Sequence, residues 1–275
     1  MNLLIQIKRR LISFQSSFYV IIYLVMKMID THSHVYEEEM PNYKEIIEEC
    51  KNKDISMIIN GVDNKSNKEI IDLANKYDNV YPAIGLNYDQ IDYFTDKDLE
   101  DLEELIESNK VIALGEIGLD YYWTKENKDK QIYFFEKQLQ LAEKYNLPVI
   151  IHSRKASQDV YDILKKYKIK GSMHCYAGSL EMAKEFIKLG FMIGVDGPIT
   201  YSNNVKGVEL VKEIPIESIL LETDSPYLAP EPNRGKQNSP LNLIYIAEKV
   251  AEIKGISTQE VIDKTTENAK ELFNI

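Results

Sequence analysis

Cysteine is scarce in this sequence, with only Cys50 and Cys175 among 275 residues. Two cysteines this far apart, without the short spacing of a metal ribbon, exclude a disulfide framework and a zinc-ribbon domain. Free thiols are typical of a reducing compartment, so we expect a cytoplasmic protein. Cys175 directly follows a histidine, but we interpret it as a small buried thiol that points to the other side of its strand.

Basic residues are outnumbered by acidic ones. The chain has 33 lysines and arginines against 44 aspartates and glutamates, which gives a net charge of −11. This balance excludes a protein that coats nucleic acid with a broad basic face, because that mode needs many phosphate contacts. Any contact with nucleic acid should be local, and bound divalent cations would offset negative charge where an anionic substrate lies.

A long uninterrupted apolar run is also missing, although a membrane span needs roughly 20 apolar residues. The best candidate, Leu11–Val25, follows three basic residues, but polar residues at 15–17 interrupt it and no small-residue cleavage site is visible. It continues without a linker into a predicted strand at Met28. We therefore interpret residues 1–27 as an N-terminal extension, or as the result of a start codon assigned too early, and expect no membrane partner.

The sequence does contain a regular series of short apolar runs of strand type. Apolar residues make up 44% and charged residues 28% of the chain, which is typical of a globular protein with a sizeable core. Eight runs are predicted as strands: Met28–His32, Ile55–Asn60, Val80–Gly85, Val111–Gly115, Pro148–His152, Gly171–His174, Phe191–Val195 and Ile219–Glu222.

Helix-type segments separate these runs, and the order of the two types predicts the fold. The predicted helices are Tyr43–Lys53, Lys68–Tyr77, Asp98–Asn109, Lys128–Tyr145, Ser157–Tyr167, Ser179–Leu189 and Lys206–Ile214, with two closing helices between Ser239 and Phe273. Strands that alternate with helices form a parallel sheet through right-handed crossovers, and eight such units close into a barrel of about 250 residues. We therefore expect an α/β protein with one (β/α)8 TIM-barrel domain at residues 28–275.

Polar residues of metal-ligand type gather at the carboxyl ends of the predicted strands. All 4 histidines lie there, together with one glutamate and one aspartate: His32, His34, Glu116, His152, His174 and Asp224. In a (β/α)8 barrel these ends converge on the face where active sites form. A lone histidine at a strand end is usually an ordinary packed residue, but six separate structural explanations are implausible because each buried polar group would need its own partner.

Four imidazoles and two carboxylates exceed the ligand set of a single catalytic ion, so we predict two divalent cations that share one carboxylate. Because residues i and i+2 of a strand point the same way, His32 and His34 can both reach one ion. Mixed imidazole and carboxylate ligands suit Mg, Mn or Zn, and the sequence does not select among them.

The motifs around these residues together resemble the TatD family of metal-dependent deoxyribonucleases. The resemblance covers residues 28–275 in order and rests on Asp30-Thr31-His32-Ser33-His34, Gly115-Glu116-Ile117-Gly118-Leu119-Asp120-Tyr121, Ile151-His152-Ser153-Arg154, Met173-His174-Cys175-Tyr176, Glu222-Thr223-Asp224-Ser225-Pro226-Tyr227, Arg234-Gly235 with Asn238 and Pro240, and Asn268-Ala269 with Leu272-Phe273. It implies a binuclear TIM-barrel hydrolase of DNA phosphodiesters, often a 3′ to 5′ exonuclease in the cytoplasm. Carried over by position, it implies that His32, His34 and Asp224 bind one ion, that His152 and His174 bind the other, and that Glu116 bridges them.

One position departs from the family pattern. The family usually carries Gly-x-His-Pro after the third strand, whereas this chain has Gly85-Leu86-Asn87-Tyr88. Asn87 is not among the expected ligands, so metal binding should persist. Substrate positioning or proton transfer near this strand should differ.

Further residues are predicted to act in catalysis and substrate binding. A water bound between two cations has its pKa lowered toward neutrality, and we predict that Asp224 orients this water and takes its proton while Glu116 spaces the ions. Arg154 could bind a substrate phosphate, with a surface ion pair as the alternative. Tyr121 and Trp123 could stack on the bases of single-stranded DNA or of a 3′ end, and packing between loops is the alternative.

Two other functions remain open from the sequence. The same metal pair on the same barrel also suits the hydrolysis of an ester, an amide or an aminoacyl bond. A noncatalytic metal-binding scaffold is the third possibility, although every proposed ligand is present.

Overall fold

The computed structural model describes residues 27–124 and 126–275. The predictions made for residues 1–26 therefore lie outside the described residues. The described residues form eight parallel strands in sequential order. These strands are β1 (Met28–Ser33), β2 (Ile55–Asn60), β3 (Val80–Ile84), β4 (Ala113–Asp120), β5 (Val149–Arg154), β6 (Gly171–Met173), β7 (Phe191–Val195) and β8 (Ile219–Leu221).

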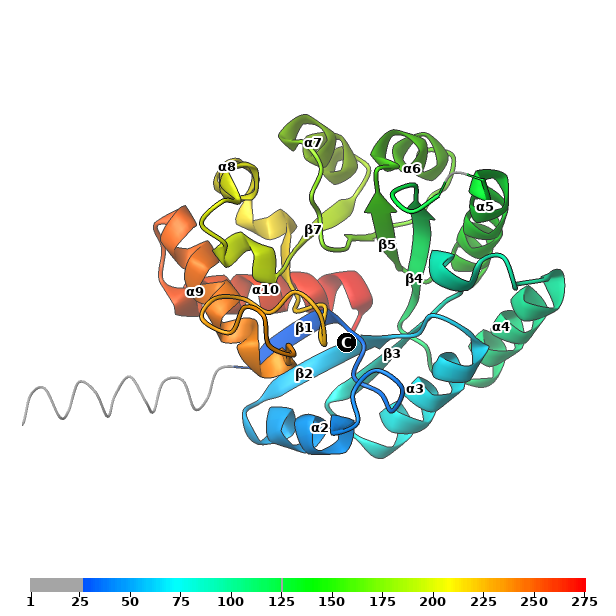
Figure 1. Cartoon of the computed structure of the whole chain (residues 1–275), viewed down its shortest axis with the longest axis horizontal. Helices are drawn as coiled ribbons and strands as arrows, with labels where there is room; N and C mark the ends of the chain where they lie inside the picture. The colour runs from blue at the N-terminus through cyan, green and yellow to red at the C-terminus, as the bar shows by residue number, and fades with distance from the viewer. Residues whose placement is uncertain (1–26, 125) are drawn as a thin grey trace, which may run out of the picture.

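The helices form an outer ring around the strands, as the predicted barrel requires (Figure 1). They are α2 (Tyr43–Asn52), α3 (Asn64–Lys76), α4 (Asp96–Ser108), α5 (Lys128–Tyr145), α6 (Ser157–Leu164), α7 (Leu180–Lys188), α8 (Val205–Glu213), α9 (Leu243–Lys254) and α10 (Thr258–Phe273). Short 3-10 helices follow at η1 (Tyr88–Gln90), η2 (Gly197–Thr200), η3 (Ile216–Ser218) and η4 (Pro240–Asn242). Among the described residues no helix has the length and apolar character of a membrane span.

The barrel closes where β1 meets the segment that follows β8. The backbone N–H of Asp224 donates to His32 O at 3.0 Å, and the N–H of His34 donates to Ser225 O at 2.7 Å. A parallel bridge between Ser33 and Ser225 completes this contact. The closing hydrogen bonds therefore join the segments that carry three of the predicted metal ligands.

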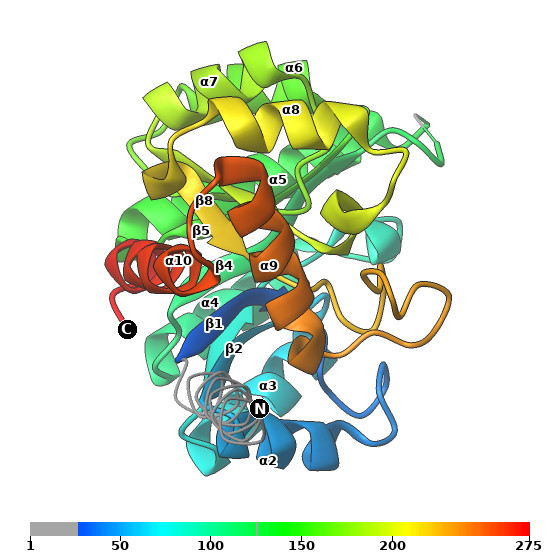
Figure 2. The ribbon, with the colours of Figure 1, turned by 90° about the vertical axis from the view of Figure 1, so that its left-hand side faces the viewer.

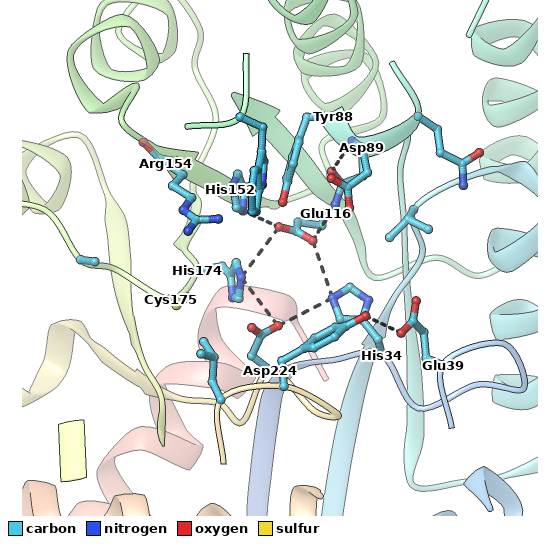
Figure 3. A pocket seen from close by; sticks show the side chains of 18 of the residues that line it. His34, Glu39, Tyr88, Asp89, Glu116, His152, Arg154, His174, Cys175 and Asp224 are labelled. Atoms are coloured by element: carbon cyan, nitrogen blue, oxygen red, sulfur yellow. Dashed lines mark hydrogen bonds and ion pairs between the residues drawn. The ribbon is translucent and has the colours of Figure 1, made fainter. Parts of the chain in front are cut away.

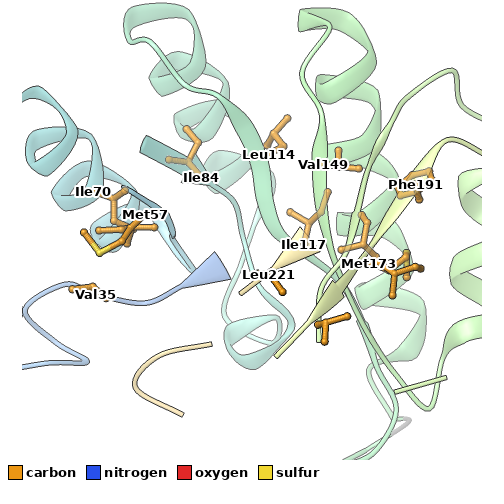
Figure 4. Close-up of a cluster of buried hydrophobic side chains, with 14 of the residues drawn as sticks. Val35, Met57, Ile70, Ile84, Leu114, Ile117, Val149, Met173, Phe191 and Leu221 are labelled. Atoms are coloured by element: carbon orange, nitrogen blue, oxygen red, sulfur yellow. The ribbon is translucent and has the colours of Figure 1, made fainter. Parts of the chain in front are cut away.

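Two hydrophobic clusters hold the barrel together. The larger one lies between the strands and the outer helices and includes Met57, Leu114 and Val149 (Figure 4). The smaller one lies inside the barrel, where Ile29, Ile150 and other strand residues pack against Ala269, Leu272 and Phe273 of α10. Figure 2 shows α10 on the side where β1 begins, with the loop that follows β8 on the other side. The carboxyl ends of the strands are thus left open for a site.

Two element boundaries differ from the sequence prediction by four residues or more. Helix α3 starts at Asn64 rather than at Lys68, because Asp63 and Ser66 form a capping box that adds a turn. Strand β4 extends to Asp120, since its second half pairs with β5 at Gly118–His152 and Asp120–Arg154. Glu116 therefore lies within its strand rather than after it.

Candidate metal centre

Five of the six predicted ligands line one cavity at the carboxyl ends of the strands (Figure 3), and the sixth, the fully buried His32, lies beside them. β1 carries His32, β4 carries Glu116 and β5 carries His152, while His34, His174 and Asp224 directly or closely follow β1, β6 and β8. The tertiary structure therefore brings together residues separated by nearly the whole length of the domain.

Glu116 lies between two groups of imidazoles, and each of its oxygens faces one group. Oε2 lies 3.7 Å from His34 Nε2 and 3.9 Å from His32 Nε2. Oε1 lies 2.8 Å from His152 Nδ1 and 3.8 Å from His174 Nε2. A carboxylate with its two oxygens turned toward separate nitrogen groups has the arrangement of a bridging ligand.

Asp224 closes the centre from the opposite side. Its Oδ1 lies 3.6 Å from His32 Nε2, 3.8 Å from His34 Nε2 and 3.9 Å from His174 Nε2. The two Nε2 atoms of His32 and His34 are only 3.1 Å apart. The i, i+2 spacing thus presents both imidazoles in one direction, as the sequence predicts.

Three of the imidazoles are oriented by acceptors on their outer nitrogen. His34 Nδ1 contacts Asn60 O at 3.0 Å, His152 Nε2 contacts Asp120 Oδ2 at 3.0 Å, and His174 Nδ1 contacts Glu222 Oε1 at 3.0 Å. Such partners fix the tautomer and the ring orientation of metal-binding histidines. In a neutral ring, this leaves the nitrogen that faces the centre with its lone pair available to a cation.

The electrostatics divide the four histidines into two pairs. Burial, followed by the charge of His174, lowers the pKa of His32 well below its usual value, and burial also lowers the pKa of His34. Burial opposes the charged form of His174 too, but Glu222 and Asp224 raise its pKa to about 10. Hydrogen bonds to Asp120 and Glu116 raise the pKa of His152 against burial. Burial thus favours the neutral form of His32 and His34, whereas the neighbouring carboxylates favour the protonated form of His152 and His174.

The donor chemistry fits divalent cations. Three groups of ligand atoms, each within 4.8 Å of one another, overlap at shared residues: His32, His34 and Glu116; His32, His174 and Asp224; and Glu116, His152 and His174. Neutral imidazole and carboxylate are the ligands expected of Zn²⁺ and related ions. Cations bound among buried acidic and imidazole groups this close together would offset their desolvation.

A cavity of about 820 Å³ lies over this centre. Its lining residues come from the loops at the carboxyl ends of the strands: His34, Glu39, Val62, Asn87, Tyr88, Asp89, Gln90, Glu116, Trp123, His152, Ser153, Arg154, His174, Cys175, Ala177, Pro198, Asp224, Tyr227 and Leu228. This volume accommodates part of a flexible substrate.

Arg154 lies at the cavity wall on an aromatic platform. Its guanidinium carbon is 3.8 Å from the ring centre of Tyr122 and 5.4 Å from that of Trp123. Among the described residues it forms no close ion pair, although its charge lowers the pKa of the Asp120 carboxyl after burial and hydrogen bonds have acted on it. Stacking leaves the edge of the guanidinium free to donate to an anion.

The two aromatic residues predicted to touch substrate lie in different environments. Trp123 lines the cavity and is 71% exposed, so its ring is available for stacking. Tyr121 is buried, lies outside the cavity lining and donates its hydroxyl to Asp159 at 3.0 Å. The structure therefore brings Trp123 to the site but gives Tyr121 the packing role that was its alternative.

Asn87, the departure from the family pattern, contacts the centre directly. Its side-chain Nδ2 donates to Glu116 Oε2 at 2.8 Å, and the residue is buried. The neighbouring Tyr88 stacks on His152 with ring centres 4.3 Å apart. Asn87 and Tyr88 thus restrain one bridging carboxylate and one imidazole.

The expectation for Cys175 is wrong. The residue follows β6 with a φ of 43°, and it lines the cavity instead of pointing away from it. This left-handed turn reverses the alternation of an extended strand, on which the expectation rested.

The comparison with known proteins agrees with this centre. The family model described as TatD related DNase matches residues 29–274. The chain belongs to this TatD family. It is accordingly a metal-dependent hydrolase, and its TIM barrel is the fold of the TatD structures that it matches.

Three similar TatD relatives span nearly the same length. The metal-dependent hydrolase YabD of Bacillus subtilis is 42% identical, over 90% of this chain and 99% of YabD. The human deoxyribonuclease TATDN3 is 32% identical, over 90% of this chain and 94% of its own. The crystal structure of the TatD homologue YjjV from Escherichia coli gives a TM-score of 0.85 at 29% identity, covering 91% of this chain and 99% of YjjV.

Sequence reasoning missed the residues that orient the ligands of this TatD centre. Asp120 and Glu222 were quoted within motifs but received no role. Asp120 lies four residues after Glu116 in one strand, and Glu222 lies two residues before Asp224, so both spacings put them near the ligands. The even spacing of Asp120 and Glu222 from the ligands was therefore the sequence signal that could have identified them.

Proposed function

We propose that this TatD hydrolase is a metal-dependent deoxyribonuclease that cleaves phosphodiester bonds of single-stranded DNA from the 3′ end. The observation that carries the proposal is the bridging position of Glu116, between two imidazole groups at the floor of a cavity with an arginine on its wall. The name of the human relative, a deoxyribonuclease, supports the choice of DNA. The proposed unit is a single domain at residues 28–275, and free thiols at Cys50 and Cys175 support a cytoplasmic location.

The positions of the carboxylates support the ligand sets that the family resemblance implies. His32, His34 and Asp224 would hold one divalent cation, His152 and His174 would hold the other, and Glu116 would bridge them. Two such cations, when bound, lower the pKa of water and stabilise negative charge on a phosphate.

Asp224 is the residue placed to handle the proton of the attacking water. Burial raises the pKa of this carboxyl well above its usual value, and Glu116 adds to the rise while His174 opposes it. A raised pKa makes this carboxylate a stronger base toward a water proton. Its carboxylate borders the cavity, so it can reach a nucleophile beside the scissile phosphate.

Arg154 and Trp123 would position the DNA strand. The stacked guanidinium offers a planar pair of donors to a phosphate, which a lysine cannot reproduce. The exposed indole of Trp123 offers a stacking surface, and stacking on a base contributes about 1–3 kcal/mol. Both contacts tolerate any sequence, as an exonuclease requires.

The decisive experiment measures cleavage of end-labelled single- and double-stranded DNA. Metal-stripped protein is reloaded with Mg, Mn or Zn, and His152→Ala serves as the control. We expect metal-dependent, stepwise shortening of single strands from the 3′ end that His152→Ala abolishes. An absence of cleavage despite bound metal would refute the proposal in favour of ester or amide hydrolysis.

Two variants test the positioning of the strand. Trp123→Ala should impair cleavage of single-stranded DNA far more than hydrolysis of a small phosphodiester, whereas equal losses would reject stacking. Arg154→Lys should raise KM for DNA about tenfold or more, because a charged hydrogen-bond pair contributes about 1.5–3 kcal/mol. An unchanged KM would remove Arg154 from phosphate binding.

A further inference from the structure

A second group of metal-ligand atoms lies beside the main centre. The Sγ of Cys175, a carboxylate oxygen of Asp196 and a carboxylate oxygen of Asp224 lie within 4.8 Å of one another. We call these three residues the thiol corner. Only Asp224 belongs to the ligand set assigned above, so two of its three donors have no role in the proposed hydrolysis.

Asp196 gives the thiol corner a carboxylate oxygen that has no hydrogen-bond partner among the described residues. The residue is only 7% exposed, and the unpaired atom is its Oδ2. Buried polar atoms are nearly always paired, because an unpaired one loses its hydration without compensation. The buried carboxylates of Glu222 and Asp224 add negative charge around Asp196, which the Cys175 thiol and His174 partly offset. A divalent cation at Asp196 Oδ2 would supply the missing partner.

Cys175 is turned toward this unpaired carboxylate by its own backbone. The left-handed φ of 43° places the residue on the cavity wall, and its N–H donates to Glu222 Oε1 at 2.5 Å. The backbone contact holds the turn in place, so the thiol has a fixed direction. A thiol held against two carboxylates in an accessible cavity is suited to metal binding rather than to core packing.

Asp224 can serve both groups because a carboxylate has two oxygens. Its Oδ1 is the atom that faces His32, His34 and His174. Carboxylates commonly bridge neighbouring cations, as Glu116 is placed to do.

We propose that the thiol corner binds a third divalent cation of the thiophilic class, of which Zn²⁺ is the representative. Thiolate ligands select Zn²⁺ over Mg²⁺, which prefers six oxygen ligands. As the bond between Sγ and the cation forms, the S–H bond breaks and its proton passes to solvent. Cys175, Asp196 and Asp224 supply three ligands and leave one tetrahedral position open to the cavity. The protein would then bind two cations per chain from a solution of Mg²⁺ or Mn²⁺ and three from a solution of Zn²⁺.

The test uses Co²⁺ as a spectroscopic substitute for Zn²⁺. Metal-stripped full-length protein is titrated with Co²⁺, and near-ultraviolet absorbance is followed for thiolate-to-cobalt charge transfer. Bound Zn²⁺ is counted separately after dialysis. We expect a charge-transfer band and about three Zn²⁺ ions per chain, because each predicted site binds one ion.

Cys175→Ser should lose the band and one ion while retaining the other two. Cys50→Ser is the matched control, since it removes the only other thiol, which lies buried in the core. Asp196→Asn, which keeps the thiol and the side-chain shape, should weaken the band at limiting Co²⁺ if the carboxylate is a ligand. The Asp196→Asn variant therefore tests the site even if Cys175→Ser fails to fold.

Three results would overturn the proposal: a wild-type protein without the band, a band that persists in Cys175→Ser, or a Cys175→Ser protein that binds as many Zn²⁺ ions as the wild type. The titration needs no substrate. A failure here would therefore leave the proposed nuclease function untouched, and a failure of the nuclease assay would leave this site untouched.

Discussion

Glu222 is predicted to control the affinity of one half of the metal centre without touching a cation. It is fully buried, and its Oε1 accepts from His174 Nδ1 at 3.0 Å and from Cys175 N at 2.5 Å. These contacts hold His174 so that Nε2 faces Glu116 Oε1 at 3.8 Å and Asp224 Oδ1 at 3.9 Å. Glu222→Gln keeps the shape of the side chain but removes the charge that orients and polarises the imidazole.

The size of the effect follows from the role of such partners. Removing the hydrogen-bond partner of a metal-binding histidine weakens metal affinity by about 10–100-fold. This range corresponds to about 1.4–2.8 kcal/mol of binding free energy. His174 serves one of the two proposed ions, whereas the other relies on His32 and His34. We therefore expect one binding step to weaken and the other to change little.

Calorimetric titration of metal-stripped protein with Mn²⁺ measures both steps. Glu217→Gln, the same chemical change on the exposed surface of η3, is the matched control and should bind Mn²⁺ as the wild type does. Circular dichroism establishes that each variant is folded. Unchanged affinity in folded Glu222→Gln, or equal weakening of both steps, would refute the reasoning. Asp120→Asn should produce the corresponding loss through His152.

Three further predictions follow from single contacts. Gly118→Ala should lower the free energy of unfolding in urea by about 3 kcal/mol or more, because φ is +146° and a Cβ would lie 2.0 Å from His152 O; a loss below about 1 kcal/mol would contradict it. Because Glu222 and Asp224 outweigh burial and raise the pKa of His174 to about 10, a cation must displace its proton, and calorimetric metal affinity should rise about tenfold per pH unit up to that pKa. The same proton also stabilises the metal-free fold: this stabilisation is complete below the ordinary histidine pKa of 6.5 and is lost as the pH rises through about 10. A metal affinity that did not change with pH would contradict the assignment. Asn87→Asp should place a second carboxylate beside Glu116, so scanning calorimetry should show a lower Tm without metal and a larger rise on metal addition than in wild type; an unchanged rise would argue against this contact.

The barrel could be predicted because its strands are short apolar runs that alternate with helix-type segments. β7, for example, has the predicted bounds of Phe191–Val195. The second half of β4 could not be predicted, since the glycine at 118 and the aspartate at 120 look like a loop. Its pairing with β5 is a tertiary effect, and only Gly118 permits the close approach to His152 O.

The candidate ligands could be predicted because parallel strands place their carboxyl ends on one face. The contacts around them depend on side-chain rotamers and on loop paths, which sequence spacing does not determine. Tyr121 and Trp123 are two positions apart, yet one ring is buried and the other is exposed. The turn at Cys175 is a local backbone choice of the same kind, so the thiol corner was not visible in the sequence.

The charge of the cavity explains why cations would be needed for binding as well as for chemistry. Glu39, Asp89, Glu116 and Asp224 line it, and Arg154 is the single lysine or arginine among the described lining residues. A DNA phosphate entering the metal-free cavity would therefore meet a surplus of negative charge, and one stacked guanidinium offsets only one of these carboxylates. The two proposed divalent cations would bring four positive charges to the floor of the cavity. An overall acidic chain can then present a locally attractive site to an anionic strand while the rest of its surface repels nonspecific nucleic acid.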